Sequence, residues 1–341
     1  MRFPFSLTMS MATYMLRKKI GGIQKFPLVL MLEPLHACNL QCNGCGRIRE
    51  YADTLGQRLS VEECLRAVLE CDAPIVSICG GEPLLYPDIV ELTDKILALG
   101  KHIYLCTNGI LLEEKLGSFV QLVKHNRRTT SRLYWNVHLD GTADVHDSIV
   151  GQPGTFDKAL SGITAAKRAE FYVYTNTTLY KGGGAVSDLI ALAERLQSVK
   201  IDGMMIAPGY GYDAVRNDPF FLNRTEIHDL FKEIRQEMKQ YRITATPVYL
   251  DFLCGDRQLP CAAWANPTRN VRGWKSPCYL VTDRHCETFR DFMQSTDWSN
   301  IGFGNDPRCQ NCMMHCGYEP AAVLFGNRLR DLVRVTLWQF R

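Results

Sequence analysis

The chain has 341 residues, of which 46% are hydrophobic and 22% are charged, and this composition is ordinary for a globular protein with one or two domains and a sizeable core. The formal net charge is only +3, and no stretch resembles a basic nucleic-acid face, so we expect no nucleic-acid partner. The longest apolar run, residues 26–32, is far shorter than the roughly 20 residues needed to span a bilayer.

The cysteine content indicates a reducing compartment. The chain holds 14 cysteines but no convincing secretory signal, because its first residues are too short and poorly patterned for one. In the cytosol such cysteines are thiols or metal ligands rather than disulfides. We therefore expect a cytoplasmic protein. Met9 or Met11 offers an alternative start, so we leave open whether residues 1–10 are native.

From residue 26 the sequence alternates short β-rich runs with amphipathic segments, the pattern of parallel βα units. Strands are expected at residues 26–33, 74–79, 102–107, 133–139, 171–177 and 203–207. The first helix begins at Ser60, which forms a capping box with Glu63, and others are expected at 88–99, 111–125, 155–169 and from Asn223 or Thr225 to 240. Six units are too few for an eight-unit barrel. The predicted fold is α/β, a partial (βα)6 TIM-type barrel over residues 26–243, with function at the carboxyl ends of the strands.

Three cysteines follow the first predicted strand. Cys38, Cys42 and Cys45 form a C-x3-C-x2-C triplet. Structural zinc sites and electron-carrier clusters usually have four protein ligands, so a compact triplet favours an iron–sulfur cluster with one position left open for chemistry. The alternative is a zinc site that takes a fourth ligand such as His36.

Three further motifs follow the next strands. Gly80 and Gly81 allow close approach of the backbone to a ligand, and Glu82 can accept a hydrogen bond from an ammonium group. Asn108 lies in a Thr-Asn-Gly turn after the third strand, and Asp140 precedes a glycine after the fourth. Each motif alone is a generic turn, but their order along the strands makes the set specific.

Together these motifs resemble those of the radical S-adenosylmethionine (SAM) enzymes. In that family three cysteines hold a [4Fe-4S] cluster, SAM chelates the fourth iron, and a GGEP motif contacts the amino group of SAM. The resemblance implies that the cysteine triplet holds this cluster and that SAM is bound by Gly80, Gly81, Glu82 and Asn108. A zinc-bearing barrel is the alternative.

Strand alternation indicates which side chains share the barrel interior. Asn136, His138 and Asp140 occupy one face of the fourth strand, and a file of polar groups would be costly on the helix-facing side. Relatives often place a small polar residue near SAM at the position of His138, which makes it a SAM contact or, equally, a satisfied core histidine. On the fifth strand, Asn176 is a candidate for the SAM ribose.

Cys106 shares a strand face with Asn108, so it is expected to face the same cavity. An S–H bond is weak enough to give a hydrogen atom to a carbon radical. The alternative is a small buried hydrophobe, which is what most free cysteines are.

Residues 244–341 form a different, cysteine-rich region. A β-rich stretch, residues 241–253, leads into a tract with seven cysteines. A four-thiolate set suited to an auxiliary iron–sulfur cluster or a zinc ion consists of Cys278, Cys309, Cys312 and Cys316. The region resembles the twitch or SPASM-type extensions of radical SAM enzymes, although its cysteine pattern is less complete, and buried thiols are the alternative. Cys254, Cys261 and Cys286 lack compact partners.

Four segments, at residues 31–48, 78–84, 138–141 and 309–320, resemble the adenosyl-hopene transferases of hopanoid biosynthesis. That resemblance covers residues 12–325. It implies that the 5′-deoxyadenosyl radical derived from SAM adds to the alkene of diploptene to give adenosylhopane. Cys106 would then be the hydrogen-atom donor that quenches the tertiary radical. Reduced flavodoxin or ferredoxin would supply the electron.

An apolar triterpene substrate also implies an apolar cavity and access to the bilayer. Tyr210 and Tyr212, in the loop after the sixth strand, are candidates for the cavity. Residues 1–25 mix basic and apolar side chains and are expected to form an interfacial helix, which would place the protein peripherally at the inner face of the cytoplasmic membrane. A solvated helix is equally compatible with this pattern.

Two other functions fit the same residues. A radical SAM enzyme that abstracts hydrogen from a peptide or another small molecule would keep the cysteine triplet and bind substrate at the auxiliary site of residues 244–341, the tail. A non-catalytic iron–sulfur or zinc protein would never cleave SAM.

Overall fold

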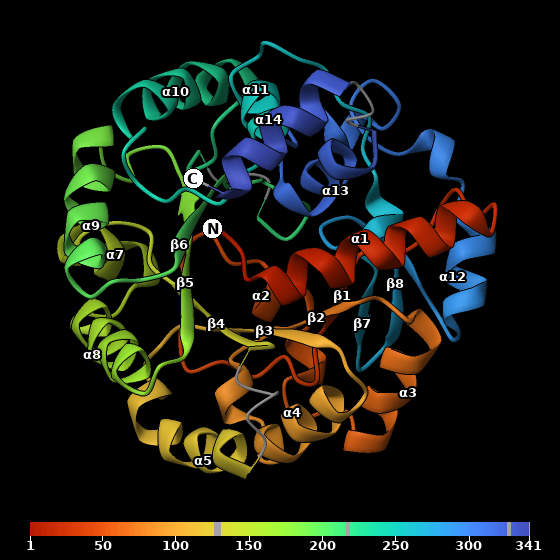
Figure 1. Cartoon of the computed structure of the whole chain (residues 1–341), viewed down its shortest axis with the longest axis horizontal. Helices are drawn as coiled ribbons and strands as arrows, with labels where there is room; N and C mark the ends of the chain where they lie inside the picture. The colour runs from red at the N-terminus through yellow and green to blue at the C-terminus, as the bar shows by residue number, and fades with distance from the viewer. Residues whose placement is uncertain (126–130, 216–218, 326–328, 341) are drawn as a thin grey trace.

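A computed structural model of the chain describes residues 1–125, 131–215, 219–325 and 329–340. Within it, a parallel sheet curves into an open barrel with helices on its outer face (Figure 1). The barrel strands are β1 (Val29–Leu32), β2 (Ile75–Ile78), β3 (His102–Thr107), β4 (Leu133–His138), β5 (Tyr172–Leu179) and β6 (Gly203–Pro208). They pair in the order β6-β5-β4-β3-β2-β1, which confirms the partial (βα)6 barrel.

The helices around the barrel largely follow the predicted segments. They are α2 (Arg47–Glu50), α3 (Val61–Cys71), α4 (Ile89–Ala98), α5 (Leu112–His125), α7 (Ala143–Val150), α8 (Thr155–Arg168), α9 (Val186–Ser198) and α10 (Arg224–Glu237). The capping boxes at Ser60 and Asn223 are both present. Sequence reasoning did not predict α7 or α9, although α9 supplies the crossover between β5 and β6.

Side-chain alternation in the strands separates two environments. The side chains of Leu30, Val76 and Ile78 are fully buried and belong to the main hydrophobic core. On β3, Tyr104 and Cys106 are only half-buried and lie on the opposite, inner face of the sheet. The barrel interior therefore keeps partly accessible side chains, as a ligand cavity requires.

The tail extends the barrel sheet. β7 (Thr268–Asn270) pairs in parallel with β1, and the antiparallel strands β8 (Gly273–Pro277) and β9 (Thr282–Cys286) follow it. The tail helices are α11 (Pro247–Leu253), α12 (Phe289–Ser295), α13 (His315–Phe325) and α14 (Leu329–Phe340). The prediction of a β-rich stretch at residues 241–253 was therefore wrong over α11, where Thr246 caps the helix and Pro247 occupies its first position.

Helix α1 (Phe5–Ile20) lies across the amino end of the barrel (Figure 1). Leu7 packs there against Ile75, Tyr134 and Tyr174, near the starts of their strands. The start of the chain is tied to its last helix by a hydrogen bond from the Gln339 amide to the carbonyl oxygen of Phe3, at 2.8 Å. None of the described helices combines the length and the apolar character needed to cross a membrane.

Candidate active site

The cysteine triplet lies in the loop between β1 and α2, at the carboxyl end of the barrel. Cys38, Cys42 and Cys45 are free thiols and all three are half-buried. The loop folds back on itself, because the Cys45 amide donates to the carbonyl of Cys42 at 3.1 Å. The Leu40 amide donates to the sulfur of Cys38 at 3.4 Å. Burial raises the pKa of the Cys38 thiol to about 11.

The two glycines after β2 are required by close packing against the cysteine loop. The amide of Gly81 donates to the carbonyl of Leu35, and the amide of Glu82 donates to that of Ala37. A Cβ atom at Gly80 or Gly81 would collide with backbone oxygens of this loop, and Gly80 also has a positive φ of 110°. The backbone of the GGEP segment is thereby fixed beside the cysteines.

The carboxylate of Glu82 is buried and already holds several donors. Oε1 accepts from Leu84 N at 2.9 Å and from Thr107 Oγ1 at 2.8 Å. Oε2 accepts from Asn108 N at 2.8 Å and has room for one more donor. Burial raises the pKa of Glu82, although the three hydrogen bonds act to lower it. Glu82 therefore joins the loops after β2 and β3 and keeps one acceptor position for a ligand.

The side chain of Asn108 reaches the cysteine loop. Its Nδ2 donates to Asn39 Oδ1 at 2.7 Å and lies 4.0 Å from the sulfur of Cys38. Its Oδ1 accepts from Ile110 N at 3.0 Å, which closes the Thr-Asn-Gly turn. The structure thus brings Asn108 together with the triplet and with Glu82.

His138 belongs to a polar cluster that sequence reasoning found only in part. Its Nε2 lies 2.8 Å from Oδ2 of the buried Asp140, whose amide donates to Nδ1 of His146 at 3.1 Å. Burial lowers the pKa of His138, but Asp140 outweighs it and the pKa is raised overall. Burial lowers the pKa of His146 to about 4. His146 lies on α7, which was itself not predicted.

Polar side chains of the neighbouring strands line the interior below these loops. Asn136 Nδ2 lies 3.6 Å from the sulfur of Cys106, and Ser77 Oγ lies 3.3 Å from it. Among the described residues, Oδ1 of Asn136 and Oδ1 of Asn176 are buried without a hydrogen-bond partner. Unpartnered buried oxygens suit a ligand that brings donors.

Arg47, two residues after the last cysteine of the triplet, is a site residue that sequence reasoning missed. Its Nε lies 3.0 Å from Glu33 Oε1, and its Nη1 lies 3.2 Å from Glu50 Oε2. Nη2 donates to the carbonyl of Tyr279 at 3.2 Å. Glu33 is fully buried, and although burial opposes ionisation, Arg47 holds its pKa down to about 2.

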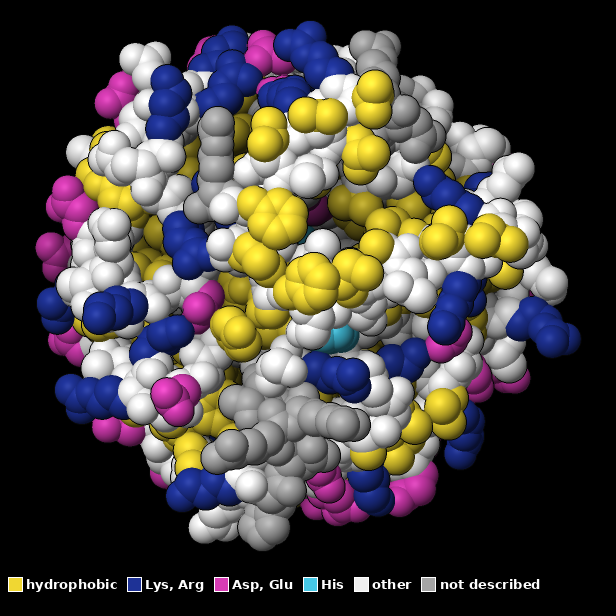
Figure 2. All heavy atoms as spheres, in the orientation of Figure 1, with side chains coloured by type: hydrophobic (Ala, Val, Ile, Leu, Met, Phe, Trp, Pro, Cys, Tyr) yellow, Lys and Arg dark blue, Asp and Glu magenta, His cyan; other side chains and the backbone are white. Residues whose placement is uncertain are grey.

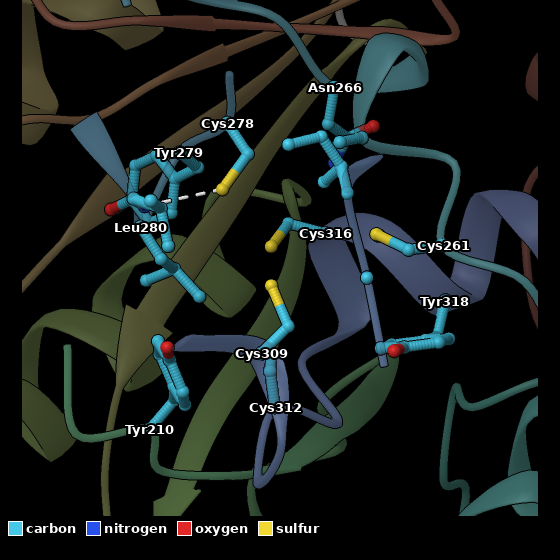
Figure 3. A pocket seen from close by; sticks show the side chains of 15 residues that line it. Tyr210, Cys261, Asn266, Cys278, Tyr279, Leu280, Cys309, Cys312, Cys316 and Tyr318 are labelled. Carbon is cyan, nitrogen blue, oxygen red and sulfur yellow. Dashed lines mark hydrogen bonds between the residues drawn. The ribbon is translucent and has the colours of Figure 1, made fainter. Parts of the chain in front are cut away.

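Cysteine side chains of the tail gather around one small pocket (Figure 3). Its lining includes Cys261, Cys278, Cys309, Cys312 and Cys316. Sequence reasoning grouped four of these and left out the first, because its distance along the chain gave no signal. The predicted four-thiolate set is thus brought together with one additional cysteine.

The cysteine groups are less compact than a single-ion site. Zinc binds thiolates at about 2.3 Å in a tetrahedron, which places the sulfurs less than about 4 Å apart. In the described part of the chain, the one set of three ligand atoms within 4.8 Å of one another belongs to His138, Asp140 and His146. Neither cysteine group brings three sulfurs within 4.8 Å of one another.

The two tyrosines expected at a substrate cavity contact two different parts of the molecule. Tyr210 lines the tail pocket, and its hydroxyl donates to the carbonyl of Arg308. Tyr212 lies against Gly46 of the cysteine loop, where a Cβ atom would collide with its ring. They connect the loop after β6 to the tail and to the cysteine loop, respectively.

Comparison with known families agrees with this geometry. Residues 32–196 match the model of the Radical SAM superfamily. This part of the chain is a radical SAM domain. Residues 204–334 match a Domain of unknown function (DUF3463). Radical SAM proteins use a [4Fe-4S] cluster and SAM, so the expectation of these two cofactors is confirmed.

Two relatives show the range of named activities. The AdoMet-dependent heme synthase of Methanosarcina barkeri is 30% identical over 67% of this chain and 64% of its own length. The chain thus spans just under two thirds of that protein. The PqqA peptide cyclase of Gluconobacter oxydans is 23% identical over 84% of this chain and 82% of its own length. These names refer to heme synthesis and to a peptide rather than to hopanoids.

Solved structures support the fold. SuiB of Streptococcus suis has a TM-score of 0.66 at 15% identity and covers 89% of this chain and 75% of its own. The enzyme anSMEcpe with bound AdoMet has a TM-score of 0.57 at 15% identity, covering 92% of this chain and 97% of its own. At these identities the likeness shows the shared architecture alone.

Proposed function

We propose that Cys38, Cys42 and Cys45 hold the [4Fe-4S] cluster of this radical SAM enzyme. Three free thiols in one loop at the carboxyl end of the barrel, beside a glycine pair in contact with that loop, carry the proposal. When bound and reduced by flavodoxin or ferredoxin, the cluster supplies one electron that cleaves SAM to methionine and a 5′-deoxyadenosyl radical.

The residues around the triplet are assigned to SAM. The backbone of Gly80 and Gly81 is packed against the cysteine loop and so holds Glu82 beside it, and the open position of Glu82 Oε2 accepts the SAM ammonium. Asn108 orients the cysteine loop through Asn39. On the inner face, His138 and Asn176 are assigned to the polar groups of the adenosyl part, because Asn176 offers an unpartnered oxygen.

The function that the comparisons favour is hydrogen abstraction from a peptide or another small molecule. The supporting observation is that relatives spanning most of this chain bear the names of a peptide cyclase and of heme synthases. The substrate would lie between the barrel mouth and the tail, where Tyr212 packs against the cysteine loop. The tail cysteines would hold an auxiliary iron–sulfur cluster near that substrate.

A second candidate is addition of the adenosyl group to diploptene, and the environment of Cys106 favours it. After such an addition the product radical must gain a hydrogen atom. Burial raises the pKa of Cys106, so the sulfur keeps its hydrogen, and Ser77 and Asn136 hold it in the barrel interior. The motif resemblance to adenosyl-hopene transferases supports the same candidate.

One assay separates the two candidates. Anaerobically reconstituted protein is incubated with SAM and dithionite, with either diploptene or a candidate peptide, and the nucleosides and lipids are analysed by mass spectrometry. Free 5′-deoxyadenosine with a modified peptide supports abstraction, whereas an adenosylated lipid supports addition. Absence of methionine release under all conditions would overturn both.

A further inference from the structure

The last helix of the chain exposes apolar side chains and buries polar ones, the reverse of an ordinary surface helix. On α14 the side chains of Leu329, Leu332 and Leu337 are 78%, 62% and 55% exposed, whereas Asp331 and Gln339 are only 4% and 6% exposed. Surface helices normally bury the apolar stripe and expose the polar one. The inward polar face is anchored, since Asp331 pairs with Arg257 at 2.8 Å. The outward apolar stripe is therefore a candidate binding surface.

The first helix presents a matching stripe beside it. On α1 the exposed apolar side chains follow a helical spacing of four, seven and four residues: Phe5, Met9, Leu16 and Ile20. The two helices are joined by a hydrogen bond from Gln339 Nε2 on α14 to Thr8 Oγ1 on α1, at 2.9 Å. Figure 2 shows apolar side chains gathered over the middle of this face. We call this surface, made by α1 and α14, the terminal-helix face.

The charge of the terminal-helix face indicates which kind of partner it binds. Residues 1–25 contain five basic side chains and no acidic one: Arg2, Arg17, Lys18, Lys19 and Lys25. Arg17 and Lys19 are exposed in the last turn of α1, next to the apolar stripe. Apolar stripes bordered by Lys and Arg fit the surface of an anionic bilayer, where the apolar side chains enter the headgroup boundary. A second copy of the chain would bring like charges together.

We propose that the terminal-helix face docks the protein on an anionic lipid surface, with α1 and α14 lying in the plane of the interface. This goes beyond the single N-terminal helix indicated by the sequence, because α14 also contributes exposed apolar side chains. The proposal does not depend on which substrate the barrel takes.

Flotation with lipid vesicles tests the proposal. Wild-type holoprotein is expected to float with vesicles that contain phosphatidylglycerol, more weakly with phosphatidylcholine alone, and less at high salt. Leu16→Glu and Leu332→Glu are each expected to reduce binding to the anionic vesicles by about 10-fold. The exposed pair Arg17→Gln and Lys19→Gln, which leaves packing untouched, is expected to remove the preference for anionic lipid.

Leu69→Glu is the matched control, since Leu69 is 61% exposed on α3 in the barrel wall. Circular dichroism establishes that each variant is folded. The proposal is overturned if wild-type protein binds neither vesicle type, or if Leu69→Glu weakens binding as much as Leu332→Glu. It is also overturned if sedimentation shows a dimer that Leu332→Glu converts to a monomer while vesicle binding is unchanged.

Discussion

The guanidinium of Arg47 lies over the ring of Tyr279, 4.5 Å from its centroid, and also donates to the Tyr279 carbonyl at 3.2 Å. Arg47 follows Cys45 by two residues, and Tyr279 is adjacent to Cys278. One buried side chain thus links the loop of the cysteine triplet to the pocket of the tail cysteines. The two cysteine sites are parts of one packed unit.

Arg47→Gln is expected to destabilise the protein strongly. The substitution leaves the carboxylate of Glu33 buried without its main cation, and breaking a buried ion pair on one side costs about 3–5 kcal/mol. Chemical denaturation under anaerobic conditions measures the loss. The exposed Arg49→Gln on the same helix is the control and should change the free energy of unfolding little. Equal effects of the two substitutions would contradict the linking role of Arg47.

Glu82→Gln is expected to weaken SAM binding while the fold persists. The amide keeps one oxygen as an acceptor for neighbouring donors but loses the charge that attracts an ammonium, so we expect an affinity about 10-fold lower. Equilibrium dialysis of the reconstituted protein measures this.

Thr107→Val provides the comparison for Glu82. It removes the hydroxyl that donates to Oε1 at 2.8 Å and is expected to cost about 1–2 kcal/mol of stability. SAM affinity should stay close to that of the wild type. If Thr107→Val lowers the affinity as much as Glu82→Gln, Glu82 acts through the loop conformation rather than on SAM.

Features set by local spacing could be predicted from the sequence, whereas features set by the fold could not. The barrel strands and the capping box at Ser60 depend on neighbouring residues and were confirmed. The partners of Arg47 and the place of Cys261 depend on β7 joining β1, a pairing across more than two hundred residues that no local pattern encodes. The helix α11 was predictable, because Thr246-Pro247 is a cap followed by a first-turn proline.

Stability is expected to depend on pH through His138. Its folded-state pKa is raised above the ordinary value of 6.5, so its ion pair with Asp140 contributes fully below pH 6.5 and is lost as the pH rises through the raised pKa. Asp140→Asn retains an oxygen for the Thr178 amide but removes the charge. The difference in unfolding free energy between wild type and Asp140→Asn should therefore shrink as the pH rises above 6.5. A difference that is constant with pH would contradict a protonated His138.

Cys106→Ala tests the hydrogen-donor role. If Cys106 quenches a product radical, the variant should still release methionine but give less reduced product or lose stereochemical control. Cys64→Ala is the control, because Cys64 is equally a free thiol but is buried among core residues outside the barrel interior. Unchanged yield and stereochemistry in Cys106→Ala would leave it as a packing residue.

The tail pocket is lined by five cysteines, one more than a four-ligand cluster needs. Cys309, Cys312 and Cys316 come from one short segment that ends in α13, whereas Cys261 and Cys278 approach from other segments (Figure 3). Residues 309–316 supply three ligands, so a four-ligand cluster needs one more from Cys261 or Cys278. The double variant Cys261→Ser with Cys278→Ser is therefore expected to lower the iron content from two clusters to one while methionine release persists, and the single variant that has the same effect identifies the fourth ligand. Cys286→Ala, buried on β9 and absent from the pocket lining, should keep both clusters. Full iron content in Cys261→Ser would remove Cys261 from the ligand set.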